Sequence, residues 1–290
     1  MFDPANPQPG IYPNLPEQVY RSAQGISQTE IKEVEVSPAH FAARKFGKAK
    51  EPTDAQVVGT LTHALVLQNR QLFCVVPEDA PRKPTQAQIN AKKPSDETLA
   101  AIQWWKTYEF NTRGKTPVSK EQADHLFEMQ AAVLRHPIAN SILRRATLAS
   151  AEVAAFKKHE ETGLMMKGLA DLVVHDDDNF MVLPDLKTTP AGGASSKEFS
   201  KSIFNWGYHR QAAWYLDLFG ATHFMFIAVE KEPPYAVAVY KLQTDAIEMG
   251  RRANERDLRI LKKCFDENKW PGYSEEIEFI GLPEWAKKRE

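Results

Sequence analysis

Residues 167–189, KGLADLVVHDDDNFMVLPDLKTT, decide the fold because they hold two apolar runs separated by the turn-forming residues DDDN. Together with AEVAAFKKH at 151–159, these runs predict three short strands that form an antiparallel meander. Three charged residues, Asp171, Asp185 and Lys187, interrupt the apolar pattern. Unpaired charges are costly within an apolar sheet, so their presence calls for a chemical explanation.

The side chains of a strand alternate between its two faces, so Asp185 and Lys187 share one side and Leu186 takes the other. If the neighbouring strand pairs as predicted, Asp171 lies beside them. Two carboxylates and an ammonium group would then converge. Carboxylates can hold one or two Mg²⁺ ions that polarise a phosphodiester and lower the pKa of a bound water. The lysine would orient that water or neutralise charge that develops on the phosphate.

An acid-x-lysine pattern alone does not establish such a site. It occurs three times in the chain, at 30–32, 185–187 and 267–269, and only the middle copy lies at the end of an apolar strand. A cross-strand salt bridge at a sheet edge therefore remains the alternative for Asp185 and Lys187.

The rest of the chain predicts helices around this strand-rich centre. Residues 1–26 are rich in proline and predict an extended N-terminal arm, and residues 27–290 predict a single domain. A capped helix is expected from Ser27, a second after residues 37–38, and another over 53–69. We expect a loop over 77–94, helices near 95–110 and 119–135, and an amphipathic helix ending at Gly220. Strands at 223–231 and 236–243 precede a long helix at 244–267. This order predicts an α/β fold in which helices flank a mixed central β-sheet.

Composition excludes several classes of protein. The chain has 290 residues, of which 42% are hydrophobic and 26% charged, and this composition is typical of a globular protein. Two cysteines, no signal-peptide pattern and no apolar run of about 20 residues predict a cytoplasmic protein that does not enter a membrane. The formal net charge of -1 disfavours a generally basic surface, so a polyanion would be bound in a local groove.

Four further residues are candidates for the site, each with a structural alternative. Gln211 and Tyr215 are four residues apart and share a helix face, which would also suit simple packing. Glu152 opens the first strand, where an exposed glutamate is common. His63 lies on an otherwise apolar helix and could be a core histidine.

Five segments in this order resemble the motifs of the PD-(D/E)XK nuclease superfamily: GTLTHALVLQ, AEVAAF, GLADLV, LPDLKTT and YHRQAAWYLD. The likeness is strongest to the exonuclease VIII (RecE) type of phage recombination nuclease, and with SPAHFAARK it extends over about residues 27–243. It implies a restriction-endonuclease-like core. The sequence departs from many members in lacking a proline before the first aspartate. Two cysteines cannot form the four-cysteine iron–sulfur cluster of another branch.

The resemblance also implies a role for each candidate residue. His63, Asp171 and Asp185 would coordinate metal, and Lys187 would be the catalytic lysine. The remaining matches, which would support the site or contact DNA, are Gln211, Tyr215 and, as the upstream glutamate, Glu152.

The activity implied is that of a Mg²⁺-dependent exodeoxyribonuclease, with Mn²⁺ able to substitute. It would degrade one strand of linear double-stranded DNA, 5′-to-3′, and leave 3′ single-stranded tails for a recombinase or single-strand annealing protein. A homo-oligomeric ring, a trimer or tetramer, is expected. Two alternatives remain: a catalytically silent DNA-binding or annealing partner, and a glycoside hydrolase with two carboxylates, which would give Lys187 and His63 no role.

Overall fold

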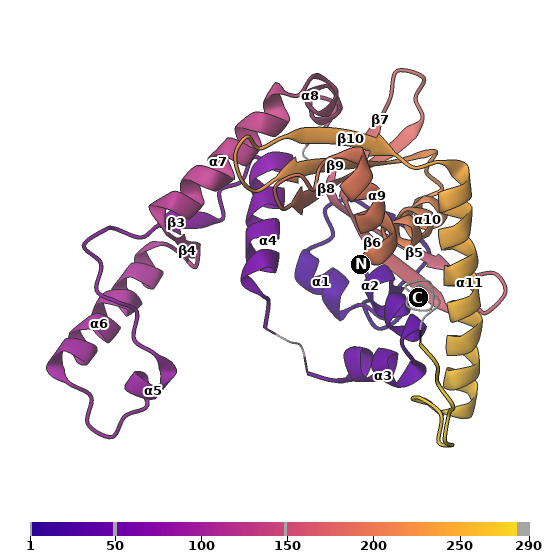
Figure 1. Ribbon diagram of the computed structural model, residues 1–290, viewed down its shortest axis with the longest axis horizontal. Helices are drawn as coiled ribbons and strands as arrows, with labels where there is room; N and C mark the ends of the chain where they lie inside the picture. The colour runs from indigo at the N-terminus through magenta and orange to yellow at the C-terminus, as the bar shows by residue number, and fades with distance from the viewer. Residues whose placement is uncertain (1, 49–50, 148–149, 283–290) are drawn as a thin grey trace.

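The computed structural model describes residues 2–48, 51–147 and 150–282, which form two four-stranded mixed sheets flanked by helices (Figure 1). The first sheet has the order β1-β5-β6-β2, and the second has the order β10-β9-β8-β7. One apolar cluster contains residues of both sheets, including Ala155, Ala170, Leu183 and Phe226, and of the helix α10. The α/β prediction is confirmed.

The first sheet is built on the predicted hairpin of β5 and β6, which pair antiparallel. The short strand β2 pairs parallel to β6, and β1 pairs antiparallel to β5. The bounds are β1 Gly10–Tyr12, β2 Ile26–Ser27, β5 Ala151–Lys158 and β6 Met165–Leu172.

The N-terminal segment is integrated into this sheet and does not form the extended arm that we predicted. β1 and the helix α1 (Glu17–Ser22) both lie within it. The rings of Phe2 and Tyr12 pack 5.2 and 5.8 Å from that of Phe156, so aromatic contacts on β5 hold the segment in place. Whether a domain boundary falls near residue 26 stays a prediction.

The second sheet corrects the predicted three-stranded meander. β8 pairs parallel to β9 and, on its other edge, antiparallel only to the two-residue strand β7. β6 and β8 therefore belong to different sheets. The backbone amide of Leu186 donates to the Asp171 carboxylate over 3.4 Å, so a side chain bridges the two strands there. The bounds are β7 Val174–His175, β8 Met181–Thr189, β9 His223–Glu230 and β10 Val237–Lys241.

The predicted amphipathic helix before Gly220 is in fact two helices, α9 (Ser196–Asn205) and α10 (Tyr208–Phe219). Gly207 separates them with φ +67°, a left-handed conformation that glycine adopts without strain. The long helix α11 (Thr244–Glu267) packs on α10, where the buried Arg210 guanidinium meets the Asp257 carboxylate at 2.6 Å. This ion pair fixes α10 between α11 and the sheets.

Other helices cover the opposite face of the second sheet. α4 (Asp54–Leu67) begins with a capping box formed by Thr53 and Gln56, and it packs with α7 (Lys120–Arg135) against Leu186 and Ile227. The remaining helices before α4 follow the predicted cap at Ser27 and the predicted turn at residues 37–38. They are α2 Gln28–Ile31, a 3₁₀ helix at Lys32–Glu35 and α3 Pro38–Phe46.

A projection extends from the body of the molecule between α4 and α7 (Figure 1). Two short parallel strands, β3 (Phe73–Val75) and β4 (Thr116–Val118), form its base. The predicted loop at 77–94 is confirmed except for the single turn α5 (Gln86–Ile89), and α6 (Asp96–Asn111) follows it. A short helix α8 (Pro137–Leu143) completes the chain before β5. Of the helices described, none is long and apolar enough to cross a membrane.

Candidate active site

Four of the predicted site residues lie close together between β6 of the first sheet and β8 of the second. On β8, the Lys187 Nζ lies 2.5 Å from Asp185 Oδ2, and Asp185 is only 6% exposed. His63 on α4 reaches the same place, because its Nδ1 lies 3.1 Å from Asp171 Oδ2. Its Nε2 lies 2.7 Å from the carbonyl oxygen of Leu186, the residue between Asp185 and Lys187. The side chain of His63 thus links α4 to both β6 and β8.

The helix α10 supplies two further contacts. Gln211 was predicted to support the site, and its Nε2 donates to Asp185 Oδ1 over 2.6 Å. The Lys187 Nζ lies 4.8 Å from the ring centre of Tyr208, within the range of a cation–π contact. Tyr208 was not among the residues predicted for the site. The signal available was its position three residues before Gln211, which places both on one helix face.

Tyr215 touches the strand that carries Asp171 and has no direct contact with the charged cluster. Its hydroxyl donates to the carbonyl of Leu169 over 3.1 Å. Burial, with the nearby negative charge, raises the pKa of Tyr215 well above its usual value, so the hydroxyl stays protonated as a donor. Gly168 permits this approach, because a Cβ there would lie 2.7 Å from Leu218 and 3.3 Å from the Tyr215 ring. Tyr215 therefore positions β6 against α10.

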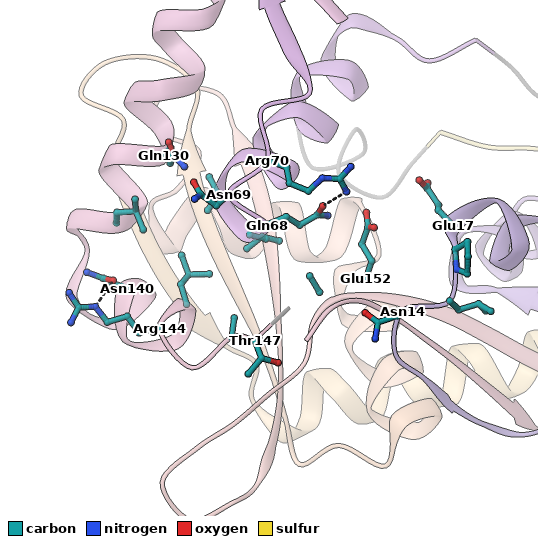
Figure 2. A pocket seen from close by; sticks show the side chains of 18 residues that line it. Asn14, Glu17, Gln68, Asn69, Arg70, Gln130, Asn140, Arg144, Thr147 and Glu152 are labelled. Atoms are coloured by element: carbon teal, nitrogen blue, oxygen red, sulfur yellow. Dashed lines mark hydrogen bonds between the residues drawn. The ribbon is translucent and has the colours of Figure 1, made fainter. Parts of the chain in front are cut away.

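Glu152 lies apart from the cluster. It falls between the β5–β6 pairs Ala151–Leu172 and Val153–Ala170, opposite Asp171, and its φ of +51° distorts the strand. Its side chain points into a cavity of about 950 Å³ that Asn14, Glu17 and Arg70 also line (Figure 2). The structure shows no hydrogen bond or ion pair of Glu152 with any described residue. Its assignment to the site remains a prediction.

Burial and the neighbouring charges shift the pKa values of all four residues of this cluster. Burial would lower the pKa of His63, but the Asp171 carboxylate raises it overall. Burial opposes ionisation of Asp171, yet His63 and Lys187 hold its pKa below the ordinary value. Burial, together with the charge of Asp171, raises the pKa of Asp185 in spite of the Lys187 ammonium. Burial would lower the pKa of Lys187, whereas the two carboxylates raise it. The two carboxylates therefore favour the protonated, positively charged forms of His63 and Lys187.

The donor set is chemically suited to a divalent cation, although its atoms are not gathered around one point. Among the described residues, no group of three or more His, Cys, Asp or Glu side chains is arranged to hold a metal ion. His63 does not present a free ring nitrogen to a metal ion in this arrangement, because both nitrogens lie against oxygen atoms of the protein. Asp185 Oδ2, however, is buried and accepts no hydrogen bond of good geometry, despite its closeness to Lys187. Asp171 and Asp185 could hold a cation, with His63 as a third ligand after release from Asp171.

Two carboxylates and a lysine from strands of the two sheets, with a histidine and a glutamine from flanking helices, are the arrangement expected of a PD-(D/E)XK domain. Residues 27–283 match the family described as PDDEXK-like domain of unknown function (DUF3799), and the chain belongs to this family. The resemblance to the PD-(D/E)XK superfamily and the restriction-endonuclease-like fold are thereby confirmed.

One solved structure with a TM-score above 0.5 agrees with the fold, and two further exonuclease structures match more weakly. The chain is similar to a candidate exonuclease from Eubacterium rectale, with 12% identity, a TM-score of 0.57, and coverage of 93% of this chain and 96% of that one. A phage-related exonuclease from Haemophilus somnus matches at 13% identity and a TM-score of 0.31, over 66% of this chain and 92% of its own. An alkaline exonuclease from Laribacter hongkongensis matches at 13% identity and a TM-score of 0.24, over 70% and 95%. No curated protein sequence matches the chain significantly.

Proposed function

We propose that the protein is a Mg²⁺-dependent exodeoxyribonuclease that degrades one strand of linear double-stranded DNA. The observation that carries this proposal is the convergence of Asp171, Asp185 and Lys187 from two sheets, with Gln211 bound to Asp185. A purely structural salt bridge needs only Asp185 and Lys187. It gives no reason for a second carboxylate and a histidine in the same half-buried place.

Each residue has a distinct part in the proposed chemistry. Asp171 and Asp185, with His63 as a candidate third ligand, would hold the cation. When bound, the cation would polarise the phosphodiester and lower the pKa of a water. Lys187 supplies a fixed positive charge for the negative charge that develops on the phosphate. Gln211 holds the Asp185 carboxylate in one orientation through its 2.6 Å hydrogen bond.

The finer features of the proposal are 5′-to-3′ polarity, 3′ single-stranded products and a ring of three or four subunits around DNA. They rest on the likeness of the sequence motifs to the RecE type. A net charge of -1 suits a ring in which lysines and arginines line the channel and acids lie outside. A recombinase or single-strand annealing protein would take up the product.

The test is a digest of one plasmid in linear and covalently closed circular forms, with Mg²⁺, Mn²⁺, Ca²⁺ or EDTA. The linear form should be degraded with Mg²⁺ or Mn²⁺, and a 5′ end label should be released before a 3′ label. Ca²⁺ prefers looser coordination and should support binding without cleavage. Equal cutting of the closed circle would instead favour an endonuclease, and hydrolysis in EDTA would exclude the metal. Binding without any cleavage would favour the silent DNA-binding alternative.

A matched pair of variants ties the activity to the site. Asp185→Asn removes a buried carboxylate of the cluster and should abolish cleavage. Asp177→Asn removes an exposed carboxylate that pairs with Arg145 at the surface, and it should leave activity unchanged. Equal activity in both variants would contradict the assignment of the site.

A further inference from the structure

An apolar groove lies between α9, the end of β10 and the first turns of α11, and none of the charged residues of the candidate active site lines it. It encloses about 450 Å³. Phe199, Ile203 and Tyr240 line it, and at its rim the side chains of Phe204 and Met249 are 65% and 47% exposed. Exposed apolar surface rimmed by polar residues is typical of an interaction site.

The chain also carries an exposed apolar peptide, after the end of α11. The backbone amide of Ala39 donates to the carbonyl of Pro271 over 3.0 Å, and the Tyr273 ring lies 5.8 Å from His40. These contacts tie the chain to α3 as far as residue 273. Beyond it, four large apolar side chains are almost entirely in water, with exposures of 89% for Ile277, 101% for Phe279, 92% for Ile280 and 72% for Leu282. We call residues 275–282 the tail.

The tail and the groove are complementary in charge as well as in polarity. The tail has the sequence EEIEFIGL, in which three glutamates accompany the apolar residues. Within the described part of the chain these glutamates form no ion pair. On the other side, Lys241 lines the groove, and Lys197 and Lys201 lie on α9 beside its lining residues. The acids Glu198, Asp245 and Glu248 also lie beside lining residues, but no Asp or Glu of the described residues lines the groove itself, so Lys241 gives its lining a positive charge. An acidic apolar peptide thus matches an apolar groove that is lined by a lysine.

The tail of one molecule does not reach its own groove. Met249 is eighteen residues before Glu267, the last residue of α11, which corresponds to roughly 27 Å along the helix axis. Ile277, Phe279 and Ile280 lie four, six and seven residues beyond Tyr273, so even a fully extended chain carries them at most about 14, 22 and 25 Å. The tail also leaves from the opposite end of α11 to α9 (Figure 1). The matching surfaces therefore meet only between different copies of the chain.

We propose that the tail of one copy binds the groove formed by α9, β10 and α11 of the next copy. Two different surfaces meet in this contact, so it is head-to-tail, and such contacts close into a ring when the rotation between subunits permits. Ile277, Phe279 and Ile280 enter the groove, while the glutamates lie near Lys241. The contact goes beyond the proposed nuclease activity, and it would build the ring suggested above.

The first test is the mass of the full-length protein in solution, measured by light scattering over a range of concentrations. The wild-type chain should form an assembly larger than a dimer. Phe279→Asp with Ile280→Asp, and separately Met249→Asp in the groove, should each raise the concentration needed for assembly at least tenfold. Phe110→Asp is the matched control, because it places a charge on an 84% exposed phenylalanine of α6, outside both surfaces. Thermal melts establish that the variants are folded.

The second test supplies the tail as a separate molecule. A fluorescent peptide of residues 273–282 should bind the Phe279→Asp, Ile280→Asp protein, whose own tail is disabled, and should not bind when Met249→Asp is added. A peptide that does not bind, or a tail variant that assembles like the wild type, would overturn the proposal. Neither readout uses DNA. An inactive protein that assembles would therefore count against the nuclease alone, and an active monomer against this interface alone.

Discussion

Replacing Lys187 by Met offers the sharpest test of the site, because it removes the charge and keeps most of the side-chain length. The Lys187 Nζ contacts Asp185 Oδ2 at 2.5 Å, and the side chain is only 17% exposed. A charge held in so little water and aimed at a developing negative charge is worth about 3–4 kcal/mol in the transition state. We therefore expect the rate of strand cleavage to fall about 10²- to 10³-fold.

Metal affinity should change in the opposite direction. The Lys187 ammonium occupies the Asp185 carboxylate that the cation would use, so the two positive charges compete. In the Met variant, Mn²⁺ should bind more tightly, because no ammonium competes with it for the Asp185 carboxylate. If the variant cleaves more slowly but binds metal more tightly, its lost activity is due to the missing lysine charge and not to loss of the metal ion.

The assays are single-turnover cleavage of a 5′-labelled linear duplex in Mg²⁺, calorimetry with Mn²⁺, and DNA binding in Ca²⁺. Lys262→Met is the matched control, since Lys262 is exposed near the end of α11, outside the groove, and pairs with Asp266. A Lys187→Met protein that keeps a tenth or more of wild-type turnover would return Lys187 to a structural salt bridge. So would a loss of activity fully explained by a lower melting temperature.

Three further predictions test Gln211, the metal ligands and, away from the site, the ionised Glu30. Gln211→Leu removes the hydrogen bond to Asp185 and should slow cleavage about 10- to 100-fold with a smaller loss of stability, whereas equal losses would indicate packing. Asp171→Asn and Asp185→Asn should each weaken Mn²⁺ binding in calorimetry, as should His63→Ala, and unchanged affinity would remove a residue from the metal site. Burial opposes ionisation of Glu30, but hydrogen bonds and a lysine lower its pKa overall, so it stabilises the fold above about pH 4.3 and loses this contribution at lower pH. Glu30→Gln should therefore be less stable than wild type at pH 7 in urea, and a gap unchanged at pH 3 would contradict this account.

The sequence by itself determined the features that depend on near neighbours in the chain. A period of two residues put Asp185 and Lys187 on one side of β8, and helical spacing put Gln211 on the inner face of its helix. Caps at Ser27 and Thr53 set the beginnings of two helices, because a cap is formed within four residues. The motif order was also sufficient for the fold class.

The tertiary structure alone decided which elements meet. An alternating strand has the same pattern whichever partner it has, so the assignment of β6 and β8 to different sheets could not be predicted from it. The same holds for β1, which aromatic packing on Phe156 draws into the first sheet. Within α9 and α10, the left-handed Gly207 turned one predicted helix into two and placed the Tyr208 ring over Lys187.

His63 and Glu152 show most clearly what the sequence could predict and what only the tertiary structure decided. Both were proposed from the same resemblance, yet His63 contacts Asp171 and the Leu186 carbonyl, whereas Glu152 faces a separate cavity. His63 is 123 residues from Leu186 in the chain, and only the packing of α4 against β8 brings them together. For Glu152, a single positive φ changes the direction of the side chain. Contacts over such separations depend on how whole elements pack, and a local pattern of residue types carries no record of that packing.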